Sequence, residues 1–151
     1  MKLQVGDKAP AFDLPAGDGI TLSLGKLRGK KVVLYFYPKD DTSGCTKEAC
    51  SFRDNLSRVR KKGAEIIGIS ADPLKSHIKF SEKYALPFPL LSDESKEVIK
   101  AYGVWQEKSM YGRKYMGIVR TTFIIDERGT ITHIFPKVTV DGHTDEVLQH
   151  L

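Results

Sequence analysis

Two apolar runs with one amphipathic helix between them constrain the fold of this chain more than any other feature. Residues 31–37 (KVVLYFY) form a nearly continuous run of β-branched and aromatic side chains, typical of a strand covered on both faces. Residues 64–70 (AEIIGIS) form a second such run. A helix is predicted between them from about Gly44 to Lys62, with Gly63 as its stop. The sequence therefore predicts a βαβ unit with a right-handed crossover.

One face of the predicted helix is apolar and includes a cysteine near its start. Apolar side chains recur at three- and four-residue steps along it: Ala49, Phe52, Leu56 and Val59. Cys45 lies one turn before Ala49 on the same stripe. We therefore expect Cys45 at the point where a buried strand turns into a helix.

The remaining elements extend this unit into an α/β fold. The predicted elements are a hairpin from Phe12–Leu14 and Ile20–Leu22 around Gly17-Asp18-Gly19, a helix over 74–84, a strand at 90–91, a helix over 96–102, strands over 120–126 and 130–135, and a last helix from about Thr144. Residues 103–117 show no clear pattern. This order predicts one domain over residues 1–151 with a thioredoxin-like fold, an N-terminal extension and an insertion before the final hairpin.

Composition excludes several classes of function. The net charge of +5 is modest, and the densest basic run, residues 58–62, falls where a helix should end, without the aromatic residues of a nucleic-acid motif. No stretch approaches the roughly 18 apolar residues of a membrane span. The N-terminus lacks the apolar core of a signal peptide, so we expect a cytoplasmic protein without nucleic-acid or membrane partners. The four histidines show no ligand spacing with the cysteines, so no metal is predicted.

The chain has two cysteines, Cys45 and Cys50. A structural disulfide is unusual in a reducing compartment, which favours a catalytic or sensing role, although burial in the core remains an alternative. A helix start presents backbone N–H groups and the positive end of the helix dipole, and both favour the nucleophilic thiolate. The Thr42 hydroxyl is close enough in sequence to reach the sulfur, or it caps the helix. A thiolate is a competent nucleophile toward a peroxide oxygen, and fast attack would also need donors that polarise the peroxide. Backbone N–H groups around Gly44 and Cys45, the Thr42 hydroxyl and one arginine could supply them, and the residues alone do not indicate which arginine.

The pattern Pro38-x-x-x-Thr42-x-x-Cys45 resembles the active-site signature of the peroxiredoxins. Cys50, five residues after Cys45, resembles the second cysteine of the peroxiredoxin Q branch, also called bacterioferritin comigratory protein. Further matches extend the resemblance over nearly the whole chain: residues 5–12 (VGDKAPAF), 88–93 (FPLLSD), 103–105 (GVW) and 120–123 (RTTF).

The resemblance implies a role for each of these residues. Cys45 would be the peroxidatic nucleophile, and Cys50 the resolving thiol that forms an intramolecular disulfide with it. Thr42 would hydrogen-bond the thiolate and the peroxide. Arg120 would lie beside the sulfur, unless it is an ordinary charge at a strand end. Pro38 would shield the pocket.

The implied activity is a thiol-dependent peroxidase acting on hydrogen peroxide and organic hydroperoxides. The backbone N–H groups around Gly44 and Cys45 are expected to help bind the substrate. No metal, haem or flavin cofactor is implied, the expected reductant is thioredoxin or a similar dithiol, and the expected state is a monomer. Ser43 departs from the proline that many relatives carry, but serine is also favoured at helix starts.

Two other classes of function remain open. A general disulfide oxidoreductase would carry Cys-x-x-Cys, whereas four residues separate these cysteines. A non-enzymatic redox sensor would use the disulfide only to change its surface.

Helix geometry adds an expectation about the disulfide. Five residues along a helix place two Cα atoms about 8.6 Å apart, with side chains about 140° apart around the axis. A disulfide usually needs Cα atoms within about 7 Å. Cys45 and Cys50 are therefore expected to join only when the first turns of the helix unwind.

Overall fold

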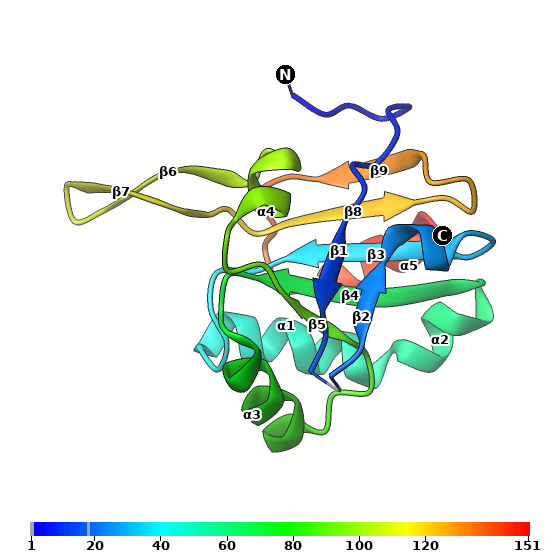
Figure 1. Cartoon of the computed structure of the whole chain (residues 1–151), viewed down its shortest axis with the longest axis horizontal. Coiled ribbons are helices and arrows are strands. Elements are labelled where there is room, and N and C mark those ends of the chain that lie inside the picture. Colours follow the sequence, from blue (N-terminus) through cyan, green and yellow to red (C-terminus); the bar gives the residue numbers. More distant parts are fainter. Residues whose placement is uncertain (1, 18) are drawn as a thin grey trace.

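A five-stranded sheet with the strand order β5-β4-β3-β8-β9 forms the centre of the molecule (Figure 1). This computed structural model describes residues 2–17 and 19–151. Strand β4 is parallel to β3 and β5, whereas β8 is antiparallel to β3 and β9. The strands are β3 Lys31–Phe36, β4 Ala64–Ser70, β5 Leu90–Ser92, β8 Thr121–Ile125 and β9 Ile131–Phe135. The predicted βαβ unit and the thioredoxin-like α/β fold are confirmed.

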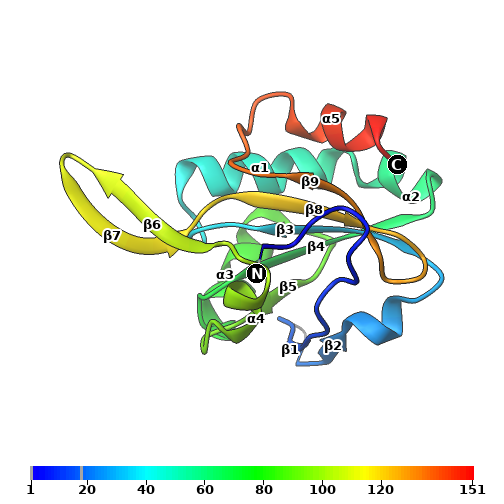
Figure 2. The same cartoon turned by 90° about the horizontal axis from the view of Figure 1, so that it is seen from above.

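Helices and a small hairpin cover the two faces of this sheet (Figure 2). One face carries α1 (Ser43–Asp54), α2 (Leu56–Lys61) and α5 (His143–Gln149). The other carries α4 (Glu97–Ala101), the 3-10 helix η1 (Leu24–Leu27), and the hairpin of β1 (Asp13–Pro15) and β2 (Thr21–Ser23). Helix α3 (Leu74–Tyr84) packs beside β5. The hairpin confirms the N-terminal extension, although Asp18 of its predicted turn lies outside the described residues.

Strand β3 is buried on both faces because its side chains alternate between two cores. Tyr35 packs against Phe52 of α1, with ring centroids 4.8 Å apart. On the opposite face Phe36 packs against Tyr102 and Phe123, at 5.1 and 5.8 Å. This two-sided burial explains why the strand is apolar without polar alternation, and it fixes the position of the loop that follows β3.

The single long helix predicted over 44–62 is wrong, because it divides into α1 and α2 at Asn55. The backbone of Asn55 has φ −110° and ψ 7°, outside the helical region. Its side-chain amide donates to the Ser51 carbonyl at 2.8 Å and shares this acceptor with the backbone N–H of Asn55, at 3.2 Å. The apolar stripe of Ala49, Phe52, Leu56 and Val59 is nevertheless buried as predicted.

The stretch without a predicted pattern forms a two-stranded arm, β6 (Trp105–Met110) and β7 (Arg113–Ile118), which projects from the body (Figure 1). Tyr111 and Gly112 link the strands, both with positive φ, as in a two-residue type I′ turn. Most side chains of the arm are exposed, so its strands lack the apolar alternation that predicts a half-buried strand.

The other element boundaries lie within one or two residues of their predicted positions, the usual uncertainty at element ends. The basic run 58–62 does lie at a helix end, because Arg58, Arg60 and Lys61 are in the last turn of α2 and Lys62 is its C-cap. Within the described part of the chain, every helix is too short or too polar to cross a bilayer.

Candidate active site

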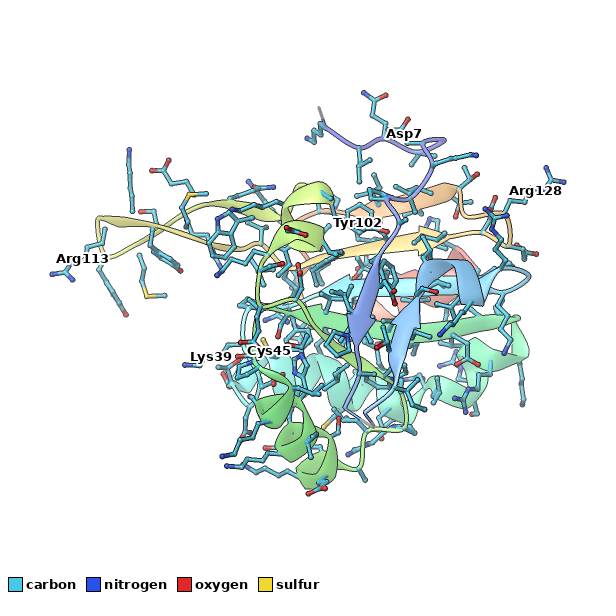
Figure 3. The ribbon with its side chains drawn as sticks, in the orientation of Figure 1. Asp7, Lys39, Cys45, Tyr102, Arg113 and Arg128 are labelled. Atoms are coloured by element: carbon cyan, nitrogen blue, oxygen red, sulfur yellow. The ribbon has the colours of Figure 1, made fainter. Side chains whose placement is uncertain are left out.

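Cys45 lies in the first turn of α1, directly after the loop that leaves β3 (Figure 3). Its side chain is buried in the core beneath α1, with 1% of the residue exposed. The thiol therefore belongs to the first turn of a 12-residue helix, where free N–H groups and the helix dipole favour negative charge. Both cysteines are free thiols, and Cys50 is half-buried five residues further along α1.

Arg120 brings a positive charge to this sulfur. Its Nη2 donates to Sγ of Cys45 at 3.3 Å. The strand pairing explains the position, because Phe36 at the end of β3 pairs with Thr121 at the start of β8. Arg120 therefore stands next to the loop that leads from β3 to Cys45, although 75 residues separate the two side chains in sequence.

Gly44 leaves room for this contact. A Cβ atom on Gly44 would stand 3.2 Å from Nη2 of Arg120, closer than most Cβ contacts in proteins. The absence of a side chain lets the guanidinium approach the start of α1. Gly44 therefore contributes to the site by leaving space for the Arg120 guanidinium, in addition to its backbone N–H group.

Glu48 is a site residue that the sequence reasoning missed. Its Oε1 accepts from Nη1 of Arg120 at 2.6 Å, and its side chain is 2% exposed. Glu48 lies three residues after Cys45, on the same face of α1, and this spacing was the available signal. Its Oε2 and the hydroxyl of Tyr35 are buried without a hydrogen-bond partner among the described residues.

Burial raises the pKa of Glu48 from its usual 4.5 to about 7, although Arg120 acts in the opposite direction. Burial acts to lower the pKa of Arg120, but the charges of Glu48 and Cys45 outweigh it, so that pKa is raised. Arg120 therefore stays a cation between two acidic groups. Below about pH 7 Glu48 holds a proton, which leaves more of the arginine's charge for the sulfur.

This pKa predicts a pH-dependent stability. Between pH 4.5 and about 7 the folded protein holds a proton on Glu48 that the unfolded chain has lost. The stabilisation from this proton is complete below pH 4.5, the usual pKa of the group, and is lost as pH rises through the folded-state pKa of about 7. Relative to the non-titrating Glu48→Gln variant, the unfolding free energy of the parent should fall by about 3 kcal/mol over this range. Urea unfolding of both proteins at about pH 5 and about pH 8 measures this fall. If the difference in unfolding free energy between parent and variant were the same at both pH values, the raised pKa of Glu48 would be contradicted.

Thr42 and Pro38 belong to the loop between β3 and α1. Thr42 stands at the N-cap position of α1, but its hydroxyl donates to the Lys39 carbonyl at 2.9 Å instead of to the sulfur. Among the described residues, the predicted hydrogen bond between the Thr42 hydroxyl and the Cys45 sulfur is therefore absent. The hydroxyl oxygen keeps its lone pairs for another donor. Pro38 is half-buried, and Ser43 is the first residue of α1.

A second polar cluster that the sequence reasoning missed lies behind this loop. Asp40, Asp72 and His77 place their ligand-type atoms within 4.8 Å of one another. Protein donors already bind both carboxylates: the backbone N–H of Asp40 and the Ser70 hydroxyl bind Asp72, whereas Asp40 accepts from His77. These hydrogen bonds account for the closeness of the three side chains without a metal.

Comparison with known proteins identifies the family. The AhpC/TSA family model matches residues 5–134. The chain is 56% identical over 151 residues to a peroxiredoxin bcp of Coxiella burnetii, and the alignment covers 100% of both chains. Peroxiredoxin Bcp of Bacillus subtilis is 46% identical, with 100% of this chain and 96% of the relative covered.

Solved structures agree with this match. A PrxQ variant from Xylella fastidiosa has a TM-score of 0.93 at 34% identity, covering 99% of this chain and 95% of that one. The bacterioferritin comigratory protein of Xanthomonas campestris has a TM-score of 0.87 at 40% identity, covering 91% and 88%. The chain therefore belongs to the AhpC/TSA family, within the peroxiredoxin Q, or Bcp, group of thiol-dependent peroxidases.

Proposed function

We propose that Cys45 is the peroxidatic nucleophile of this peroxidase. Its thiolate attacks one peroxide oxygen, the O–O bond breaks, and the sulfur becomes a sulfenic acid. The second oxygen leaves with the bonding electrons and takes up a proton, giving water or an alcohol. The observation that carries this assignment is the 3.3 Å contact from the Arg120 guanidinium to the buried Cys45 sulfur at a helix start.

The neighbouring groups have distinct roles in this step. Arg120 stabilises the thiolate before attack and the negative charge on the leaving oxygen during it. The backbone N–H groups around Gly44 and Cys45 are further donors for the peroxide. The Thr42 hydroxyl turns from the Lys39 carbonyl to the bound peroxide. Pro38 covers the approach to the sulfur.

Cys50 is the resolving thiol in this proposal. Its sulfur attacks the sulfenic acid, an S–S bond replaces the S–O bond, and water is released. An external dithiol then reduces the disulfide by exchange, which returns both thiols. The Cys50→Ser variant should consume one equivalent of peroxide and stop with one added oxygen on Cys45. Intact-mass spectrometry after one equivalent measures this. A variant that keeps all its thiol and gains no oxygen would contradict the division of roles.

Disulfide formation has a structural consequence because both cysteines lie in α1. Helix geometry keeps their Cα atoms farther apart than the roughly 7 Å that a disulfide tolerates. We therefore expect the first turns of α1 to unwind on oxidation. Hydrogen exchange should be faster across residues 45–52 in the oxidised protein than in the reduced one, and unchanged in β4. Equal protection of the amides of residues 45–52 in the reduced and oxidised protein would contradict the expected unwinding.

The substrates are proposed to be hydrogen peroxide and organic hydroperoxides, since the Xanthomonas campestris relative was studied for alkyl peroxide reduction. The proposed reductant is thioredoxin, and the protein acts as an atypical 2-Cys peroxidase. A resolving thiol in the same chain lets a monomer of one domain, residues 1–151, complete the cycle. A cytoplasmic location provides the reducing environment that the cycle needs.

A coupled assay tests this function. NADPH consumption is followed with thioredoxin, thioredoxin reductase and either hydrogen peroxide or cumene hydroperoxide. The proposal expects turnover that depends on both the peroxide and thioredoxin. Reduction of insulin disulfides without peroxide consumption would indicate a general disulfide oxidoreductase, and a disulfide that forms once without turnover would indicate a redox sensor.

A further inference from the structure

A buried Asp–His contact links the loop that precedes α1 to α3. Asp40 lies in the loop from Pro38 to Thr42, and His77 lies in α3. The Asp40 Oδ2 and His77 Nδ1 atoms are 2.6 Å apart, and their side chains are 3% and 0% exposed. No step of the proposed reaction uses either group, and the sequence motif does not include His77.

The hydrogen bonds define where the protons lie in this pair. Nε2 of His77 is 3.0 Å from the Leu91 carbonyl, which only accepts, so this nitrogen carries a proton. The 2.6 Å contact of Nδ1 with Asp40 therefore needs a second proton. Asp40 also accepts from the hydroxyls of Tyr37 at 2.6 Å and Ser76 at 2.8 Å. These two hydroxyl donors already bind the carboxyl group, and this favours leaving the second proton on Nδ1, so that a carboxylate faces an imidazolium.

The groups around the pair are consistent with these charges. Burial raises the pKa of Tyr37 well above its usual range, so its hydroxyl stays neutral and donates. The Asp72 carboxylate accepts from the Asp40 backbone N–H at 2.8 Å and from the Ser70 hydroxyl at 2.7 Å. The lysines of α3 that line the adjoining surface cavity with Asp40 are Lys75, Lys79 and Lys83.

The hydrogen bonds of Asp40 hold the loop from Pro38 to Thr42 at its middle residue. The Asp40 side chain fixes the loop to α3 and to Tyr37, the residue that follows β3. The Asp40 backbone fixes it to the turn that precedes α3. The next residue, Asp41, has φ +56°, a conformation that costs a non-glycine residue energy and needs support from its surroundings. The loop ends at Thr42, which starts the helix turn that carries Cys45.

We infer that the Asp40–His77 ion pair positions the loop from Pro38 to Thr42 and thereby favours the closed, peroxide-reactive form of the Cys45 site. The inference rests on the proposed roles of Cys45 and Cys50. A loosened loop misplaces the donors around the sulfur, which slows peroxide attack. The resolving step requires an opened α1, so a loosened loop leaves that step unchanged or accelerates it. Opposite effects on the two steps distinguish positioning from a general loss of structure.

The charge state is tested first in the unmodified protein, independently of any activity. In protein labelled with ¹⁵N-histidine, we expect the ring that makes these two hydrogen bonds to carry protons on both nitrogens. The His77→Gln spectrum assigns that ring to His77. A His77 ring with one unprotonated nitrogen in the reduced protein would overturn the inference even if peroxide is turned over normally.

The kinetic test uses Asp40→Asn. Oxidation of Cys45 is timed with Cys50 replaced by serine, and disulfide formation is timed with Cys50 present. We expect oxidation to slow by roughly tenfold to a hundredfold, with disulfide formation unchanged or faster. The matched control is Lys83→Gln, which removes the exposed partner of neighbouring Asp41 and should change either rate by less than about twofold.

The outcomes separate the possible failures. Equal slowing of both steps, or no change in either, would overturn the positioning role. If Asp40→Asn does not fold, Ser76→Ala, which removes a neutral donor to the same carboxylate oxygen, gives the same two-step comparison with a smaller expected effect. A parent protein that consumes no peroxide would instead overturn the proposed function, while the ¹⁵N measurement would still test the ion pair.

Discussion

The Cys45→Ser variant is expected to lose peroxide turnover by roughly three orders of magnitude or more. A serine hydroxyl remains protonated at neutral pH and is a far weaker nucleophile than a thiolate. The surrounding donors would still bind peroxide, but no group would accept its oxygen. Initial rates in the thioredoxin-coupled assay measure the loss.

The variant also tests which cysteine attacks. Serine is close to cysteine in volume, so the buried position should keep its packing and the circular dichroism spectrum should be unchanged. The matched control is Cys50→Ser, which should still consume one equivalent of peroxide. If Cys45→Ser kept a tenth or more of the parent turnover, the attacking thiol would have been assigned to the wrong cysteine.

The Arg120→Met variant should slow oxidation of Cys45 by about a hundredfold, a loss of roughly 3 kcal/mol in transition-state stabilisation. Methionine keeps much of the side-chain length but removes the charge and the donor that is 3.3 Å from the sulfur. The variant should also carry a smaller thiolate fraction at neutral pH. Stopped-flow oxidation at several pH values measures both effects.

Two further variants control this experiment. Arg113→Met removes an exposed arginine from the β6–β7 arm and should leave the oxidation rate unchanged. Arg120→Met also leaves Glu48 buried without its cation, so the double variant with Glu48→Gln restores neutrality there and separates stability from rate. An unchanged rate and an unchanged thiolate fraction would reduce Arg120 to a structural residue.

The centre of the fold was predictable because burial on both faces of β3 and β4 leaves apolar runs without polar alternation. The break at Asn55 was not, because only this one residue leaves the helical conformation and the apolar stripe continues across it without interruption. The β6–β7 arm was not predictable either. Its strands are held by pairing with each other and expose most of their side chains, so no burial pattern marks them.

In the site too, residues marked by a local pattern were predictable and residues placed by distant contacts were not. Cys45 was indicated by its place between a buried strand and a helix, a local property of the sequence. Arg120 was indicated only by the family resemblance, because its approach to the sulfur depends on the pairing of β3 with β8. Glu48 and His77 act through partners distant in sequence, 72 residues away for Glu48 and 37 for His77. Such contacts leave no periodic signal, and only the three-residue spacing from Cys45 pointed to Glu48.

Peptide mapping by mass spectrometry after one equivalent of hydrogen peroxide tests the central claim most directly. The reduced parent protein is oxidised, alkylated to block any free thiol, digested and compared with an unoxidised sample. The account predicts a monomer that has lost two hydrogen atoms, with one cross-linked product joining Cys45 to Cys50 and no alkylated cysteine. A protein in which both cysteines are still alkylated, or one whose disulfide joins two chains, would contradict it.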